Sequence, residues 1–216
     1  RRFIKYLKLL PRDLFKIIVM LLFAFPFYWM LITAFKTYGE AILTPPTLWP
    51  RNFTVESFQT ISELGVGLWR YALNSVIVTL SIIAIQMVIM SLAAYAFAKR
   101  SFPLQGILFG IVMVAFMIPE QITYISVFLM MSRAKLINTL WPQILPFGAN
   151  AFGIFLLRQG FKQIPDEIIE SAKLDSASEL QIITQIMLPM SKATMVTIAM
   201  FSFISHWNAY FWPLVM

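Results

Sequence analysis

The sequence contains no cysteine and only one histidine, His206. Without cysteine the chain can form no disulfide, no thiolate metal site and no cysteine nucleophile. A single histidine also excludes a clustered histidine metal site, so we expect no metal and no cofactor bound by this chain itself. Charged residues are scarce as well: they make up 12% of the chain, whereas a soluble domain has about 25%.

Apolar residues are correspondingly abundant. They make up 59% of the chain, and 15% of its residues are aromatic. This chain has too few polar residues to cover so much apolar surface in water, which indicates that lipid surrounds it. We therefore predict an all-α polytopic membrane protein, with residues 1–216 forming a single transmembrane domain.

Long uncharged runs predict the membrane spans, because about 20 apolar residues cross a bilayer core as a helix. Residues 106–131 form one such segment, which is interrupted only by Glu120. We expect five helices in this sequence, and a sixth beyond Met216 that would return the chain to the starting side. The five predicted helices are 14–35, 72–98, 106–131, 140–158 and 193–216.

Lysine and arginine near the spans predict the orientation. Twelve of them lie in the N-terminal segment and the loops on its side, against five in the loops on the other side. This predicts that the N-terminus lies in the cytoplasm. The net charge of +7 is explained by this asymmetry, so we expect no nucleic-acid partner.

The predicted outer loop, residues 36–70, contains three prolines that favour extended chain. Thr54 is positioned to cap a short helix that runs to about Leu64. Two readings stay open for this loop: a surface lid, or a docking face for an extracytoplasmic partner.

The loop at residues 159–191, here named the charged loop, concentrates charge in an apolar chain: nine of the 27 charged residues fall between Arg158 and Lys192. Pro165 followed by Asp166 and Glu167 predicts a helix from about Pro165 to Asp175. Ile168, Ile169 and Ala172 would share one face of it.

A second short helix is expected from about Ser178 to Met187. The sequence from Ser176 to Glu179 matches a capping box, and Pro189 would end the helix because proline cannot continue a helix interior. Acidic residues outnumber basic ones in these two helices, which disfavours an anionic lipid surface. We therefore expect a compact knob that docks into a groove of another protein.

The residues of this loop resemble the EAA motif of permease subunits of bacterial ATP-binding-cassette importers. Glu170-Ser171-Ala172 opens the motif, Ser176 holds the place of its glycine, and Ile186-Met187-Leu188-Pro189 closes it with every spacing kept. Ser176 is the notable departure, since glycine adopts a left-handed backbone more readily than serine.

Other segments resemble the carbohydrate-uptake branch of this family, which includes the second permease subunit of maltose-type importers. These segments are Asn74–Val76, Tyr95–Arg100, Met117–Pro119, Phe155–Gln159, Ile164–Pro165, Trp207–Asn208 and Trp212–Leu214.

The resemblance implies a location in the bacterial inner membrane, the partners and the role of the charged loop. It implies a second permease subunit forming a heterodimer, two ATPase subunits that carry ATP and Mg, an extracytoplasmic solute-binding protein, and a sugar or oligosaccharide substrate. The charged loop would be the coupling helix seated in a cleft of the ATPase. The interface residues expected there are Glu167, Glu170, Ser171, Ala172, Asp175, Ser176, Ile186, Leu188 and Pro189.

Polar groups inside lipid usually face protein or a water-filled cavity, which gives candidates for the translocation path: Glu120, Trp207, Asn208 and Tyr210. Glu120 could equally lie at the outer interface, if the span ends near Pro119. For Trp212 we favour the aromatic belt at the membrane surface. Gln86 and Asn150 are expected to form interhelical hydrogen bonds.

Two other classes of protein are weaker alternatives. An ion-coupled secondary transporter would carry intramembrane carboxylates, of which only Glu120 qualifies. A membrane enzyme would need convergent nucleophiles, paired carboxylates or metal ligands, which the sequence does not offer. The chain also lacks the GxxxxGK[ST] nucleotide loop, so we expect it not to be an enzyme and ATP hydrolysis to occur on separate subunits.

Overall fold

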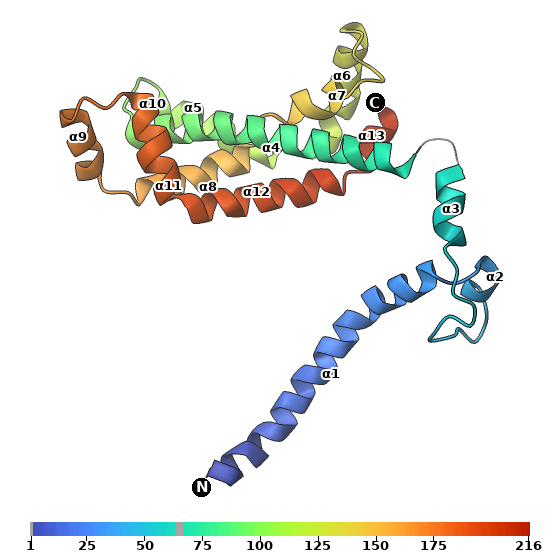
Figure 1. The fold of residues 1–216 in the computed structure, drawn as a ribbon. Coiled ribbons are helices and arrows are strands. Elements are labelled where there is room, and N and C mark those ends of the chain that lie inside the picture. Colours follow the sequence, from blue (N-terminus) through green and yellow to red (C-terminus); the bar gives the residue numbers. More distant parts are fainter. Residues whose placement is uncertain (1, 64–66) are drawn as a thin grey trace. The chain divides into compact units, whose positions relative to one another are not determined.

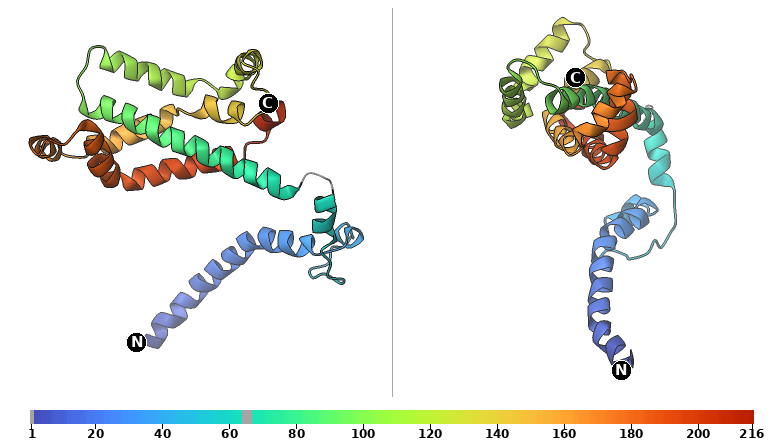
Figure 2. Two further views of the ribbon diagram at one scale, coloured as in Figure 1. Left: turned by 45° about the horizontal axis from the view of Figure 1, so that its top comes forward. Right: turned by 90° about the vertical axis from the view of Figure 1, so that its left-hand side faces the viewer.

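The computed structural model describes residues 2–63 and 67–216, with side chains from residue 13 onward. Its described residues are helical with connecting turns, which confirms the predicted all-α class. The chain divides into two compact units, Arg1–Tyr71 and Ala72–Met216. Figures 1 and 2 show the helices of each unit.

The first unit contains α1 (Arg2–Ala34), α2 (Tyr38–Ala41) and α3 (Glu56–Glu63). The apolar face of α1 is open: Leu22, Phe23 and Met30 are each more than 60% exposed. Apolar side chains exposed over this length match a helix that lies in lipid or against other helices. Asp13–Ala34 is one of two single helices in the described residues that are long and apolar enough to span a membrane.

The loop after α1, predicted to lie on the outer side, is folded back on itself. Glu40 Oε1 accepts hydrogen bonds of 2.8 Å from the Thr47 hydroxyl and from the backbone N–H of Arg51. Lys36 is buried, donates to the Thr47 carbonyl and lies 4.5 Å from the centre of the Trp29 ring. The loop is therefore ordered around one buried carboxylate and one buried ammonium group.

The helix predicted after Thr54 is confirmed as α3, with the Thr54 hydroxyl oxygen accepting from the Glu56 N–H at 3.1 Å. Leu64, its expected end, lies outside the described residues.

The second unit is a helical bundle built from α4 (Leu68–Lys99), α5 (Gln105–Met117), α8 (Ala151–Lys162) and α12 (Lys192–Trp207). α4 is the second single helix that could span a membrane, and α8 packs against α5 and α12. The main core cluster includes Met90, Leu157, Phe161, Ile182 and Met187, all with no exposed surface.

Polar contacts join the bundle further along. Gln86 donates to the Phe147 carbonyl and accepts from the Ser202 hydroxyl, each at 2.7 Å. The interhelical bonds expected for Gln86 are thus confirmed. Asn150 instead caps α8, its side-chain oxygen accepting from the Gly153 N–H at 2.9 Å, so the interhelical role expected for it was wrong.

The predicted helix 106–131 is not continuous. α5 ends at Met117, and α6 (Glu120–Arg133) leaves it at an angle of 96°. Pro119 explains the break, because a proline disfavours helical backbone in the residue before it, and Ile118 is extended with ψ 121°. Counting each bent pair as one span gives up to four candidate spans in the described residues.

The last two predicted helices are also interrupted. Trp141–Ile144 forms α7 and Leu145–Phe147 a 3-10 turn before α8, which runs four residues past the expected end at 158. α12 stops at Trp207, and Phe211–Val215 forms the separate helix α13. The charged loop lies at one end of the bundle, and α6, α7 and α13 lie at the other (Figures 1 and 2).

Candidate functional site

The first helix of the charged loop, α9 (Asp166–Leu174), agrees closely with the prediction. Pro165 precedes it, Asp166 and Glu167 occupy the first turn and Lys173 the last, so all three charges favour the helix dipole. Ile169 is buried in the main core and Ala172 packs against it. Ile168 is exposed, so only two of the three residues predicted to share one face pack against the bundle.

The joint after α9 forces Ser176 into a left-handed conformation, with φ 60°. The N–H of Ala177 bonds to the Ala172 carbonyl and the N–H of Ser176 to the Lys173 carbonyl, both at 3.0 Å. This pair of bonds is a Schellman motif, which needs a residue with positive φ at the position Ser176 holds. The motif explains why glycine suits this position and why serine carries some backbone strain there.

The capping box lies two residues later than predicted. Ser178 caps α10 (Glu179–Gln181): its hydroxyl accepts from the Gln181 N–H at 3.3 Å, and the Gln181 side chain accepts from the Ser178 N–H at 2.8 Å. The prediction that Ser176 and Glu179 form this box was wrong, because Ser176 is committed to the end of α9. Glu179 is therefore free to bind elsewhere.

The second helix also continues past its expected end. A π-helical segment, Ile182–Met187, leads into α11 (Leu188–Met190), and the turn comes at Ser191. Pro189 was predicted to end the helix. The wider π-turn directly before it changes the hydrogen-bonding pattern where proline has no N–H to donate, so the helix tolerates this residue. The chain then bends by 83° into α12.

The C-terminal end of α4 holds both helices of the charged loop. Lys99 Nζ lies 2.6 Å from Asp166 Oδ1 and 2.6 Å from the Ile164 carbonyl oxygen. The Tyr95 hydroxyl donates to Glu179 Oε2 at 2.6 Å, and Arg100 forms an ion pair with the other oxygen of Glu179. These contacts, with the buried Ile169, fix the loop to the bundle.

Sequence reasoning did not assign roles to Tyr95, Lys99 and Arg100. The sequence did contain one indication of these contacts, because Lys99 and Arg100 end a predicted span on the same side as the acidic loop. Their partners lie at least 65 residues away in the chain, so only the packing of α4 against the loop identifies them.

The predicted interface residues divide into two sets. Glu167, Glu170, Ser171, Asp175, Ser176 and Pro189 are exposed, whereas Ala172, Ile186 and Leu188 are half-buried. Ala172 and Leu188 pack against the core of the bundle. Sequence reasoning missed Leu174, which lies at the C-terminal end of α9 with 86% of its surface exposed. An apolar side chain so placed among carboxylates can insert into an apolar pocket of another protein.

The four candidate path residues lie elsewhere in the second unit and are all exposed. Glu120 begins α6 at the bend, and Asn208 ends α12, its side-chain amide donating to the Ile204 carbonyl at 2.8 Å. Trp207 stacks on Phe203 with ring centres 5.3 Å apart. Among the described residues, no hydrogen bond or ring contact joins these four to one another, so their role stays a prediction.

Trp212 differs from its prediction. It is 5% exposed, and its indole N–H donates to the Pro142 carbonyl at 2.9 Å. A side chain so enclosed cannot lie in a lipid headgroup belt. It instead joins α13 to α7, while Tyr124 of α6 packs against the same ring at 5.1 Å.

Comparison with known proteins agrees with this architecture. Residues 87–216, more than half of the chain, match the family described as "Binding-protein-dependent transport system inner membrane component". The chain is 32% identical over 197 residues to the sn-glycerol-3-phosphate transport system permease protein UgpE of Salmonella typhi, covering 89% of this chain and 70% of that protein. The same-named protein of Escherichia coli O1:K1 / APEC is 30% identical with the same coverage.

The fold also matches a chain in the crystal structure of a bacterial ABC transporter involved in the import of the acidic polysaccharide alginate. The TM-score is 0.82 at 22% identity, over 100% of this chain and 75% of that one. None of these similarities supports an ion-coupled transporter. The chain belongs to the family of inner-membrane components of binding-protein-dependent transport systems, and it is a multi-pass permease subunit of an importer.

Proposed function

We propose that the charged loop couples this permease to separate ATPase subunits, which supply the energy for import. The observation that carries this proposal is the placement of Leu174. Its side chain is 86% exposed at the tip of α9, although the backbone beneath it is held by the Schellman motif. Burying a leucine side chain is worth about 1.5–3 kcal/mol, which makes Leu174 a strong anchor for a partner.

The exposed carboxylates around Leu174 make the proposed docking surface negatively charged. Glu167, Glu170 and Asp175 lie on the same short segment and are exposed. They favour a cleft with basic or N–H donor groups at its rim, because charge complementarity selects partners and speeds their encounter.

The same geometry lets the loop transmit motion. α9 is fixed to α4 through Lys99 and to the core through Ile169, while Glu179 fixes α10 to Tyr95 of α4. A force applied at Leu174 therefore moves the ends of α4, α8 and α12 together. Alternation between inward-open and outward-open states of the importer would follow from this coupled movement.

The transported solute is proposed to be a sugar or oligosaccharide. The relatives above are named for sn-glycerol-3-phosphate transport and for alginate import, and both of those solutes are rich in hydroxyl groups. A second permease subunit completing the pore as a heterodimer, two ATPases and an extracytoplasmic binding protein are the proposed partners. The N-terminus and the charged loop would then both face the cytoplasm.

Crosslinking tests the docking role directly, because the chain has no native cysteine. Leu174→Cys should crosslink to the ATPase subunit in the assembled importer. Ile122→Cys, equally apolar and 71% exposed but on α6, is the matched control and should not. Ala172 is a poorer site because it packs inward.

A second variant measures the energetic role. Leu174→Asp should release the ATPase subunit about 10-fold to 100-fold more readily, as expected for loss of one buried leucine, without lowering the thermal stability of the permease. Unchanged ATPase retention by Leu174→Asp, together with no crosslink from Leu174→Cys, would refute the coupling role.

A further inference from the structure

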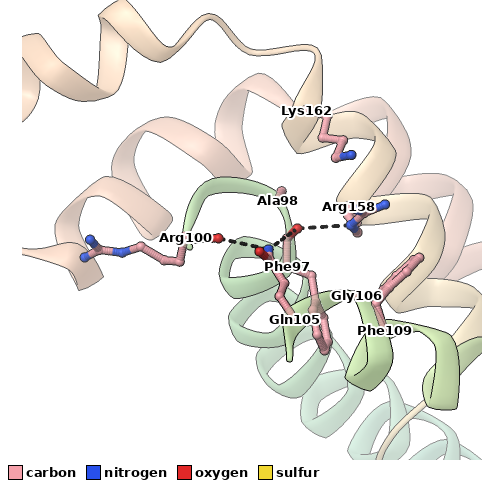
Figure 3. A pocket seen from close by; sticks show the side chains of 8 residues that line it. All are labelled: Phe97, Ala98, Arg100, Gln105, Gly106, Phe109, Arg158 and Lys162. Atoms are coloured by element: carbon pink, nitrogen blue, oxygen red, sulfur yellow. Dashed lines mark hydrogen bonds between the residues drawn. The ribbon is translucent and has the colours of Figure 1, made fainter. Parts of the chain in front are cut away.

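A second feature of the bundle lies beside the charged loop: a cavity of about 320 Å³ between the end of α4, the start of α5 and the end of α8. Figure 3 shows the side chains around it. They are three cationic side chains, one amide, two phenylalanine rings and two small residues: Arg100, Arg158, Lys162, Gln105, Phe97, Phe109, Ala98 and Gly106.

The cations of this pocket are not balanced by carboxylates. Among the described residues, none that lines it is acidic, and of its three cations only Arg100 has an acidic partner there, Glu179. Within the described part of the chain, Arg158 and Lys162 form no ion pair. They stand four residues apart on α8 and project to the same side of it (Figure 3). Like charges at this spacing destabilise a helix, so an anion between them would relieve a repulsion.

Two backbone carbonyls in the pocket wall are already occupied. The Phe97 carbonyl accepts from Arg158 Nε at 3.0 Å and from the Gln105 amide at 3.0 Å, and the Arg100 carbonyl accepts from the same amide at 2.9 Å. What remains open to a ligand is the terminal part of the Arg158 guanidinium and the Lys162 ammonium. A ligand with several acceptor oxygens and negative charge fits these donors, and the fork of an arginine guanidinium matches the oxygens of a phosphate group.

The other walls of the pocket are apolar, and an exposed apolar face of α5 lies beside them. The Arg158 guanidinium lies 4.0 Å from the centre of the Phe109 ring, and a Cβ added at Gly106 would meet nothing within 4 Å. Just beyond, Ile107 and Ile111 of α5 are 62% and 59% exposed. An anionic head placed in the pocket would leave room for hydrocarbon chains along this face of α5.

We propose that this pocket binds the phosphodiester headgroup of an anionic phospholipid. The pocket lies where α4, a membrane-spanning helix by length and composition, ends at Lys99, which is the level at which headgroups occur. Basic pockets between transmembrane helices bind such headgroups on the cytoplasmic side. Free phosphate offers the same oxygens but makes no use of the exposed apolar face of α5.

The test uses the full chain in the assembled importer, purified in detergent. Native mass spectrometry would count retained lipid after incubation with phosphatidylglycerol, with phosphatidylcholine of the same acyl chains, or with inorganic phosphate. Lys162→Gln removes one unpaired cation, and Gly106→Leu fills the pocket while keeping every charge. Lys192→Gln, an exposed lysine that does not line the pocket, is the matched control.

We expect wild type and Lys192→Gln to retain phosphatidylglycerol in preference to phosphatidylcholine. Lys162→Gln should lower that retention about fivefold, the factor for one cation at an anionic membrane surface, and Gly106→Leu should lower it at least as much. Equal retention of both lipids, equal loss in Lys192→Gln, or unchanged retention in Gly106→Leu would overturn the proposal. Displacement of the lipid by millimolar inorganic phosphate would assign the site to free phosphate instead.

Discussion

The hydroxyl of Tyr95 on α4 donates a hydrogen bond of 2.6 Å to Glu179 Oε2, the first residue of α10 and 84 positions further along the chain. The Tyr95 ring is buried in the main core of the bundle, whereas the Glu179 side chain is 43% exposed. The bond therefore connects the packed interior to the loop that we propose docks the ATPase.

Replacing Tyr95 by phenylalanine should loosen α10 without emptying the core, because only the hydroxyl is lost. Hydrogen bonds to charged groups contribute about 1.5–3 kcal/mol. We expect about 1 kcal/mol here, since Glu179 is partly solvated and keeps its ion pair with Arg100. Amide hydrogen exchange of a peptide covering residues 177–190 should become several-fold faster. The exposed Tyr210, changed to phenylalanine, should leave this exchange unaltered.

Ser176→Gly should stabilise the joint of the charged loop. A left-handed residue with a Cβ costs about 1–2 kcal/mol, while glycine adds about 0.4–1 kcal/mol of unfolded-chain entropy, so the net gain is about 0.5–1 kcal/mol. The same change at Ser171, inside α9, should instead destabilise by about 0.5 kcal/mol, the difference in helix propensity between serine and glycine. Thermal unfolding of the assembled importer would compare them, and a loss of stability in Ser176→Gly would contradict the left-handed assignment.

Gln86 and Ser202 share a buried hydrogen bond, but replacing Gln86 should cost more stability than replacing Ser202. Ser202→Ala leaves one lone pair of Gln86 without a partner and should cost about 0.5–1.5 kcal/mol, the range found between membrane helices. Gln86→Leu should cost more, because it strands both the Ser202 hydroxyl and the Phe147 carbonyl. The comparison is by thermal unfolding, with the exposed Ser205→Ala as the control. Equal costs for the two variants would show that the Phe147 contact contributes nothing.

The loop after α1 should lose order in acid. The Arg51 backbone N–H, which bonds to Glu40, holds the pKa of this carboxyl below its ordinary value, and the Thr47 hydroxyl acts in the same direction. A lowered native pKa means that the stabilisation is complete above the unfolded value of about 4.3 and is lost as the pH falls through the native pKa.

Hydrogen exchange of a peptide covering residues 42–53, corrected for the intrinsic pH dependence of exchange, would measure this effect. Wild type should be better protected than Glu40→Gln at pH 7, and this difference should shrink as the pH falls below the unfolded pKa and through the lower native pKa. A protection difference that persists in acid would show that the Glu40 charge does not hold the loop.

Local chemistry allowed part of this protein to be predicted. Apolar content indicated a helical membrane protein, and Pro165 with the acidic residues after it placed α9 to within one residue at each end. The EAA-like spacing identified the loop and the family. These features depend on residues close together in the chain, where backbone preference and helix dipole act without help from distant segments.

Competing local signals were resolved only by packing. Two serines could each begin the second helix of the charged loop, and Ser178 does so because Ser176 is held in the Schellman motif. Pro119 could either kink one continuous helix or separate two helices, and the 96° bend between α5 and α6 shows that it separates two. Trp212 had an amphipathic ring suited to a membrane surface, yet Pro142 and Tyr124 enclose it.

The sequence by itself determined the class of fold, the position of the charged loop and the family to which the chain belongs, because these follow from composition and short-range spacing. The tertiary structure decided how α4 holds the loop, which side of α9 faces outward, and how Arg158 of α8 comes to line a pocket with Phe97 at the end of α4. Those features join residues tens of positions apart, and their partners are selected by burial and by the cost of leaving polar groups unpaired, which no local pattern records.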